Sequence, residues 1–215
     1  MDRGEKIAVY YAYGDIVDTS LANAFDNNSV IDAQKVCKDL EKIMNDDDIK
    51  AVVFRVNSGG GSAYASEQIW HQITLLKKKK PIVVSMGGAA ASGGYYISCG
   101  ADYIFAEPTT LTGSIGIFGT IPNVAKLRDK IGVDVDGVGT NKHSDLEGNI
   151  IYKGMNKEEQ ALLQAMIERG YDLFTSRCAE GRHVEQDYIK SIGEGRVWLG
   201  AKGKEIGIVD ELGNI

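Results

Sequence analysis

The chain has 215 residues, of which 43% are hydrophobic and 25% charged, which is typical of a folded globular protein and excludes a disordered, collagenous or coiled-coil chain. Its formal net charge of -6 at pH 7 disfavours a nucleic-acid-binding protein, which is usually basic. Cys37, Cys99 and Cys178 are widely spaced and odd in number, so they indicate neither a disulfide framework nor a metal site.

The first half of the chain alternates strand and helix signals. Apolar runs and helical spacing predict, in chain order, a strand over Ile7–Tyr13, a helix over Asp32–Met44, a strand over Ala51–Val56, a tight turn over Asn57–Gly61, a helix over Ser62–Lys80, a strand over Ile82–Ser85, a glycine turn over Met86–Tyr95 with a short helix to about Cys99, and a strand over Tyr103–Ala106. Pro81–Ala101 carries no charge, but it is too rich in glycine and serine to predict a membrane span.

The second half is more helical. We predict helices over Val124–Ile131, Lys157–Arg182 and Val184–Ser191, a strand over Val133–Val138, and a strand–helix–strand tail over Arg196–Leu199, Gly200–Ile206 and Val209–Asp210. The charged start of the chain is not a signal peptide. No linker or repeat stands out, so we expect one α/β domain over residues 1–215 with a helical C-terminal part.

Two glycine turns carry the candidate chemistry, because each follows a strand and opens a helix. They are Val56–Ser62 and Met86–Tyr95. Helix N-termini present free N–H groups and partial positive charge, and two of them side by side can hold a developing oxyanion. The GxxxxGK[ST] and GxGxxG phosphate-binding patterns are absent. Ser92, among alanines and glycines, is therefore either a structural N-cap or a nucleophile.

A serine nucleophile needs a base. The three histidines are weak candidates, because His71 and His183 are expected at the surface and His143 lies in a polar loop. No metal-ligand spacing such as HExxH occurs, so neither a metal nor a cofactor is predicted.

Three motifs and the C-terminal tail together resemble the signal peptide peptidase A (protease IV) family of membrane-bound bacterial serine peptidases, from about residue 7 to 213. The motifs are Arg-Val-Asn-Ser-Gly-Gly-Gly-Ser ending at Ser62, Ala90–Ser98 and Leu111–Gly119, and the tail is Gly195–Gly200 with Gly207–Asp210. The resemblance implies an α/β fold of the crotonase/ClpP-like class, built from repeated β-β-α units.

The resemblance also implies roles for individual residues. Ser92 matches the nucleophile, and Gly60 and Gly93 match the residues whose N–H groups form the oxyanion hole. Ser114 matches a serine that orients the catalytic lysine. Gly59 stands where the family usually has proline, a departure that could loosen the turn.

The lysine base is the open point, because it must be neutral and its reference pKa is about 10.4. In single-domain members it follows the serine in the same domain, and an alignment through His143 and Asp145 puts Ser144 there. Lys142 is the alternative base within this chain. In two-domain members the lysine comes from the N-terminal half and the serine from the C-terminal half. This chain looks like such a C-terminal half, so we expect the base to come from another domain.

The resemblance therefore implies a serine endopeptidase that cleaves extended apolar segments such as remnant signal peptides, with the isolated chain inactive or nearly so. The expected partners are peptide substrates, an N-terminal homologous domain and further copies of the protein, with no nucleic acid. The native protein is expected at the extracytoplasmic face of the bacterial cytoplasmic membrane, held by a segment outside this sequence, whereas this fragment is expected to be soluble. The alternatives are a crotonase-type acyl-CoA enzyme, for which Glu67 is the nearby carboxylate, and a catalytically silent scaffold.

Overall fold

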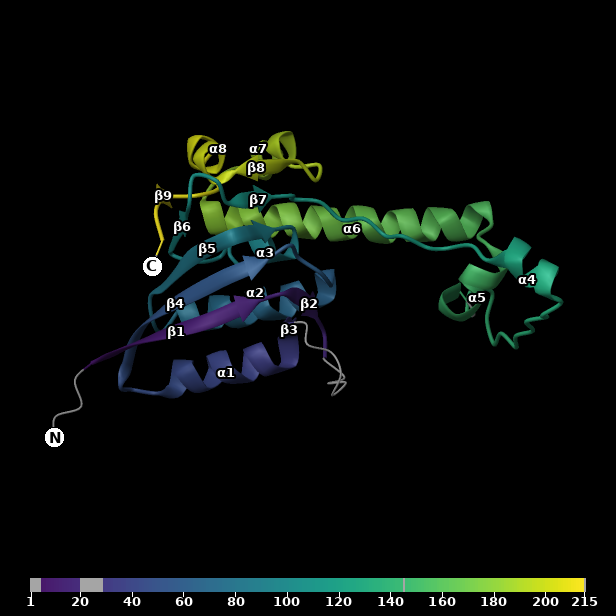
Figure 1. The fold of residues 1–215 in the computed structure, drawn as a ribbon, viewed down its shortest axis with the longest axis horizontal. Helices are drawn as coiled ribbons and strands as arrows, with labels where there is room; N and C mark the ends of the chain where they lie inside the picture. Colours follow the sequence, from purple (N-terminus) through teal and green to yellow (C-terminus); the bar gives the residue numbers. More distant parts are fainter. Residues whose placement is uncertain (1–4, 20–28, 145, 215) are drawn as a thin grey trace. The chain divides into compact units, whose positions relative to one another are not determined.

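The structure is a computed structural model that describes residues 5–19, 29–144 and 146–214. It divides into two compact units, of which the first consists of Met1–Gly116 and Tyr171–Ile215 and the second of Ile117–Gly170. The sequence alone indicates a single domain, because no change in composition marks the second unit. The first unit contains both glycine-rich segments and so carries the candidate site (Figure 1).

The described part of the first unit is built on a seven-stranded sheet (Figure 1). Its main path is parallel, in the order β1, β4, β5, β6, β9; β7 pairs in parallel with the end of β5, and β8 pairs antiparallel with β7. The strands are β1 (Lys6–Tyr13), β4 (Ile49–Ser58), β5 (Ile82–Ala91), β6 (Tyr103–Ala106), β7 (Leu111–Gly113), β8 (Val197–Leu199) and β9 (Glu211–Leu212). Two further strands, β2 (Asp15–Val17) and β3 (Val30–Asp32), form a small parallel sheet. Neither these two strands nor β7 are among the strands predicted from the sequence.

Helices cover one face of this sheet, and α1 and α2 lie on the same side of β1, β4 and β5 (Figure 1). The helices of the chain are α1 (Ala33–Asn45), α2 (Ala63–Lys77), α3 (Gly93–Tyr96), α4 (Ala125–Ile131), α5 (Leu146–Lys153), α6 (Lys157–Arg182), α7 (Gln186–Ile192) and α8 (Gly200–Glu205). The core holds fully buried strand residues such as Phe54 and Val84 together with helix residues such as Leu40 and Ile69, and removal of this apolar surface from water is the main stabilising contribution.

The starts of α1 and α2 follow from their capping residues. Asp32 accepts a hydrogen bond from the Lys35 N–H at 2.9 Å, and Ser62 accepts one from the Ala65 N–H at 3.2 Å. Each side chain satisfies one of the free N–H groups of a first helical turn. The predicted starts of both helices at these residues are confirmed to within one position.

The prediction of a glycine turn over Met86–Tyr95 is wrong for its first six residues, which continue β5 as far as Ala91. β7 provides the partner that the local composition does not reveal, since Ala89 and Ala91 pair with Leu111 and Gly113. The helix that follows, α3, spans only Gly93–Tyr96.

Two further strand predictions are wrong. Val133–Val138 is irregular rather than extended, and its ends are exposed, with Val138 at 97%, so its apolar pattern does not reflect burial in a sheet. Val209–Asp210 precedes the last strand, which is β9 at Glu211–Leu212. The long helix α6 is confirmed over Lys157–Arg182. No helix within the described ranges combines the length and the apolar character that a membrane span requires.

Candidate active site

Ser92 lies at the junction between β5 and α3 in a backbone conformation that serine rarely adopts. Its φ is 52° and its ψ is -121°, which is strained for a residue with a Cβ atom. Two backbone hydrogen bonds stabilise this conformation. The Ser92 N–H donates to the Gly113 carbonyl at 2.9 Å, and the Ser92 carbonyl accepts from the Tyr96 N–H at 2.9 Å. Strained residues of this kind concentrate at functional sites.

The Ser92 hydroxyl is not used as a cap. Ser92 occupies the N-cap position of α3, but its side chain makes no capping hydrogen bond, and no hydrogen bond of its hydroxyl to another described residue is found. The residue is partly exposed. This geometry removes the structural N-cap as an explanation for Ser92 and leaves its oxygen available to a reactant.

Gly60 and Gly93, the predicted donors of the oxyanion hole, lie against each other beside Ser92. A Cβ atom at Gly60 would lie 2.8 Å from the Gly93 nitrogen and 2.8 Å from the Ser92 Cβ, and Gly60 has a φ of +112°. Only glycine fits this close approach. The two turns thus meet at the carboxyl ends of β4 and β5, which is where ligands bind in parallel α/β sheets.

The two amides differ in their present partners. The Gly60 N–H donates to the Ser58 hydroxyl at 3.0 Å, inside a buried turn, whereas the Gly93 N–H has no acceptor within the described part of the chain. Ser58 is only 3% exposed, and nothing in the sequence pointed to it. The Gly93 amide is therefore the donor that is free to meet an oxyanion in this arrangement.

The turn that carries Gly60 is held by backbone hydrogen bonds, although Gly59 stands where the resemblance implies a proline. Ile16 donates its N–H to the Gly60 carbonyl at 2.9 Å and accepts from the Ser62 N–H at 2.8 Å. A Cβ atom added at position 59 would meet no atom within 4 Å. The contacts of Ile16 thus restrain the turn in the absence of proline.

Ser114 and Ser92 each directly follow a strand end, and these two strand ends pair through Ala91 and Gly113. Ser114 directly follows Gly113, which accepts the Ser92 N–H, and its own N–H donates to the Arg196 carbonyl at 2.7 Å. Its φ of 48° is also positive. The predicted lysine-orienting serine is therefore held as tightly, and with the same kind of strain, as the predicted nucleophile.

Lys142, the predicted base within this chain, belongs to the second unit and is paired there. Its amine lies 2.7 Å from Glu158, and its side chain is 72% exposed. Hydrogen bonds from Lys142 and then His143 lower the pKa of Glu158. A base must be neutral, whereas an ion pair with a carboxylate requires the ammonium form. Ser144, the residue at the position expected for lysine, bonds to Asn141 in an exposed turn, and Asp145 lies outside the described residues.

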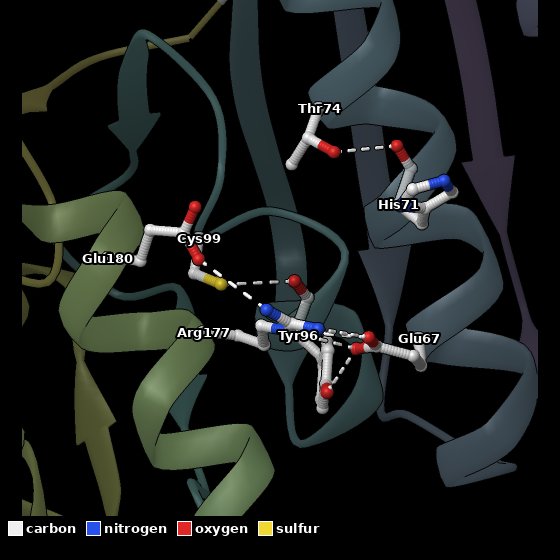
Figure 2. Close-up of polar contacts among 7 residues, drawn as sticks. All are labelled: Glu67, His71, Thr74, Tyr96, Cys99, Arg177 and Glu180. Atoms are coloured by element: carbon white, nitrogen blue, oxygen red, sulfur yellow. Dashed lines mark hydrogen bonds and ion pairs between the residues drawn. The ribbon is translucent and has the colours of Figure 1, made fainter.

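Glu67, the carboxylate of the acyl-CoA alternative, is engaged in a cluster with Tyr96 and Arg177 (Figure 2). It accepts a hydrogen bond from the Tyr96 hydroxyl at 2.5 Å, and it forms an ion pair with Arg177, whose guanidinium nitrogen lies 2.8 Å away. Tyr96 also stacks on Phe174 with the ring centroids 4.3 Å apart. Burial and the hydrogen bond to Glu67 raise the pKa of Tyr96. Tyr96 thus packs between α3 and α6, and these contacts occupy the oxygens that a general base would need.

The histidines have no place in this group. His71 and His183 are exposed, as predicted, and His143 contacts Glu158 in the second unit. Within the described residues there is no group of three or more His, Cys, Asp or Glu side chains that could hold a metal ion.

Comparison with known proteins agrees with this geometry. Residues 74–215 match the model of peptidase family S49, and residues 4–110 match that of Clp protease. Protease 4 of Haemophilus influenzae is 41% identical over 210 residues, which cover 97% of this chain and 33% of that protein. Protease 4 of Salmonella typhi is 41% identical over 214 residues, which cover 99% of this chain and 33% of that protein.

The chain therefore spans about a third of the length of these two relatives. Among solved structures, a ClpP1 variant from Listeria monocytogenes gives a TM-score of 0.61 at 18% identity, over 96% of this chain and 91% of that one. This likeness confirms the predicted α/β fold of the ClpP-like class. The family match covers most of the chain, and the chain belongs to peptidase family S49.

Proposed function

We propose that this chain is the nucleophile-bearing domain of a serine endopeptidase that cleaves extended apolar segments such as remnant signal peptides. Membership of family S49 and similarity to Protease 4 support the reaction class. The observation that carries the proposal is the strained Ser92, whose hydroxyl has no partner among the described residues and which lies beside the Gly60–Gly93 contact.

In the proposed reaction the Ser92 oxygen attacks the scissile carbonyl carbon and gives its proton to a neutral lysine. The carbonyl oxygen becomes an oxyanion, which accepts hydrogen bonds from the N–H groups of Gly93 and Gly60. The C–N bond then breaks, the lysine returns the proton to the leaving amine, and an acyl-enzyme forms on Ser92. Water hydrolyses that ester with the same lysine as base. Because the Gly60 N–H is bonded to Ser58, it must exchange that acceptor for the oxyanion.

The base comes, in this proposal, from another domain of a longer protein, and Ser114 orients it. Two observations support this placement. The chain corresponds to a third of its relatives' length, and Lys142 is exposed and paired with Glu158. The partner domain, assembly of several copies and attachment to the extracytoplasmic face of a bacterial membrane through a segment outside this sequence belong to the same proposal.

The substrate is proposed to bind as an added strand beside the glycine turn, since an extended peptide can form main-chain hydrogen bonds with an exposed strand edge. In this binding mode the enzyme recognises the main chain of the substrate rather than its side chains. It suits segments that are extended and apolar, and it brings the scissile carbonyl to the Ser92 oxygen.

Labelling by a fluorophosphonate probe tests the nucleophile. In the full-length protein we expect a covalent adduct on Ser92 that Ser92→Ala abolishes, together with peptide cleavage. Ser191→Ala is the matched control, because the exposed Ser191 hydroxyl only donates to the Tyr188 carbonyl at 2.6 Å. Unchanged cleavage in Ser92→Ala would support the scaffold alternative, and binding of acyl-CoA thioesters without labelling would support the acyl-CoA alternative.

A further inference from the structure

A pocket on the first unit is not used in the proposed reaction. It has a volume of about 380 Å³, and Trp70, Thr74, Lys78, Gly100 and Gly181 are among its lining residues. They come from α2 and the residue that follows it, from the segment after α3 and from the end of α6. The volume lies within the range of small-molecule sites, and none of the residues grouped around Ser92 lines it.

A buried hydrogen-bond donor belongs to a residue that lines this pocket. Trp70 is only 4% exposed, and its Nε1–H has no acceptor within the described residues. A buried donor without a partner costs about 1–3 kcal/mol, so natural proteins rarely leave one unexplained. A Cβ atom at Gly100 would lie 2.9 Å from this nitrogen. Gly100 thus packs against the Trp70 nitrogen without placing a side chain on it.

The indole ring is fixed in place from its other side. The Arg177 guanidinium lies over the Trp70 ring, 4.1 Å from its centroid. Arg177 is held in turn by Glu67, which also accepts the Tyr96 hydroxyl (Figure 2). A donor that is already oriented loses little conformational entropy when a ligand binds.

The charges around the pocket point to an anionic ligand. Lys78 is exposed, and its amine has no hydrogen bond or ion pair to another described residue, whereas Lys77 already donates to the Gly100 carbonyl and pairs with Asp102. Glu180 also lines the pocket but pairs with Arg177 at 3.6 Å. Among these charged side chains, Lys78 is therefore the one that can form an ion pair with an anionic ligand.

We propose that this pocket binds a small carboxylate with an apolar body. One carboxylate oxygen accepts the Trp70 Nε1–H, the Lys78 ammonium pairs with the carboxylate, and the apolar part lies against Trp70, Gly100 and Gly181. The same chemistry is offered by a free carboxylic acid and by the C-terminus of a peptide that ends in an apolar residue. The proposal does not depend on the reaction proposed for Ser92.

Calorimetric titration of the full chain tests the proposal with phenylacetate and with the tripeptide acetyl-Ala-Ala-Leu. We expect saturable binding of at least one of these carboxylates and no binding of the corresponding neutral amide. Binding of phenylacetate alone identifies a free acid, and binding of the tripeptide alone identifies a peptide terminus. In the variant Trp198→Phe, Trp70 is the only tryptophan, so its fluorescence should change with the same saturation curve.

Lys78→Gln should weaken binding by about 5–10-fold, as expected for the loss of a charge-assisted contact. Lys79→Gln is the matched control, because the neighbouring Lys79 is also exposed but donates to Asn45 at 3.1 Å, and it should leave binding unchanged. Trp70→Phe, which removes the N–H donor together with one of the two fused rings, should weaken binding further, with circular dichroism as the check on folding. Equal affinity of Lys78→Gln and Lys79→Gln, equal affinity for acid and amide, or no binding of either carboxylate would overturn the proposal.

Discussion

The Ser92 N–H donates to the Gly113 carbonyl at 2.9 Å, and this bond places the end of β5 beside the end of β7. Ser92 and Ser114 consequently follow two paired strand ends, and both have positive φ angles, 52° and 48°. A positive φ costs an ordinary residue about 1 kcal/mol or more. The strained conformations of Ser92 and Ser114 therefore lower the stability of the fold, and they hold two hydroxyl groups at the carboxyl ends of these strands.

Replacement of Ser114 by glycine should separate stability from activity. Ser114→Gly relieves the strain at φ 48°, so we expect the free energy of unfolding to change little or to rise by up to about 1 kcal/mol. In the full-length protein the same change should lower peptide cleavage at least tenfold, because the lysine loses its orienting group. Urea unfolding and steady-state kinetics measure the two effects. A variant that keeps full activity would remove Ser114 from the proposed mechanism.

Gly60 and Gly59 form a matched pair for substitution by alanine. Gly60→Ala would bring a Cβ within 2.8 Å of the Gly93 nitrogen and of the Ser92 Cβ, at a φ of +112°. We expect a loss of about 1–3 kcal/mol in unfolding free energy and a loss of about 100-fold in activity from the distorted oxyanion site.

Gly59→Ala should be close to neutral in both measurements, because a Cβ atom added at position 59 meets no atom within 4 Å. Thermal unfolding and fluorophosphonate labelling of the two variants compare them directly. Similar behaviour of both variants would contradict the close packing of Gly60 on Gly93.

The sequence predicts the parts of the site that depend on short-range order. The helix starts near Asp32 and Ser62 are predicted to within one position, and the meeting of the two turns follows from parallel strands ending at one edge. The extension of β5 through Met86–Ala91 could not be predicted in this way, because its partner β7 begins twenty residues after Ala91 and supplies the pairing. Glycine and alanine carry no strand preference of their own.

Contacts between distant residues are the other part that the sequence does not reveal. Arg177 and Glu67 are separated by 110 positions, and each alone is an ordinary charged residue on an amphipathic helix. Ser58 is missed for a different reason, since its bond to the Gly60 N–H depends on the conformation of the turn. In both cases tertiary geometry, and not local pattern, decides the role of the side chain.

Tyr10 provides a test of the packing of β1 through pH. Burial, followed by the nearby Asp39, raises the pKa of Tyr10 to about 12, above its ordinary value of about 10 in an unfolded chain. The folded state therefore holds this proton where the unfolded state releases it. The resulting stabilisation is complete below pH 10 and is lost as the pH rises toward 12.

We expect the free energy of unfolding to fall between pH 10 and pH 12, and to fall less steeply in Tyr10→Phe. Tyr64→Phe is the control, because the Tyr64 side chain is 67% exposed near the start of α2. Urea unfolding at both pH values measures the two slopes. Equal slopes for Tyr10→Phe and the unchanged protein would show that Tyr10 is not shielded by its stacking on Phe54.

The last prediction concerns the source of the base. Lys142 pairs with Glu158 at 2.7 Å on an exposed surface of the second unit, so Lys142→Gln in the full-length protein should leave kcat and KM for a peptide substrate unchanged. The lost exposed ion pair should change stability by no more than about 1 kcal/mol. Ser92→Ala is the positive control and should abolish turnover.

The isolated 215-residue chain should give no turnover in the same assay, because the proposed lysine is outside it. Robust cleavage by this chain that Lys142→Ala abolishes would place the base in the second unit and contradict a base supplied by another domain. Cleavage that survives Lys142→Ala would instead require a different base within the 215 residues. Activity restored by adding the separate N-terminal part of the protein would support the shared site directly.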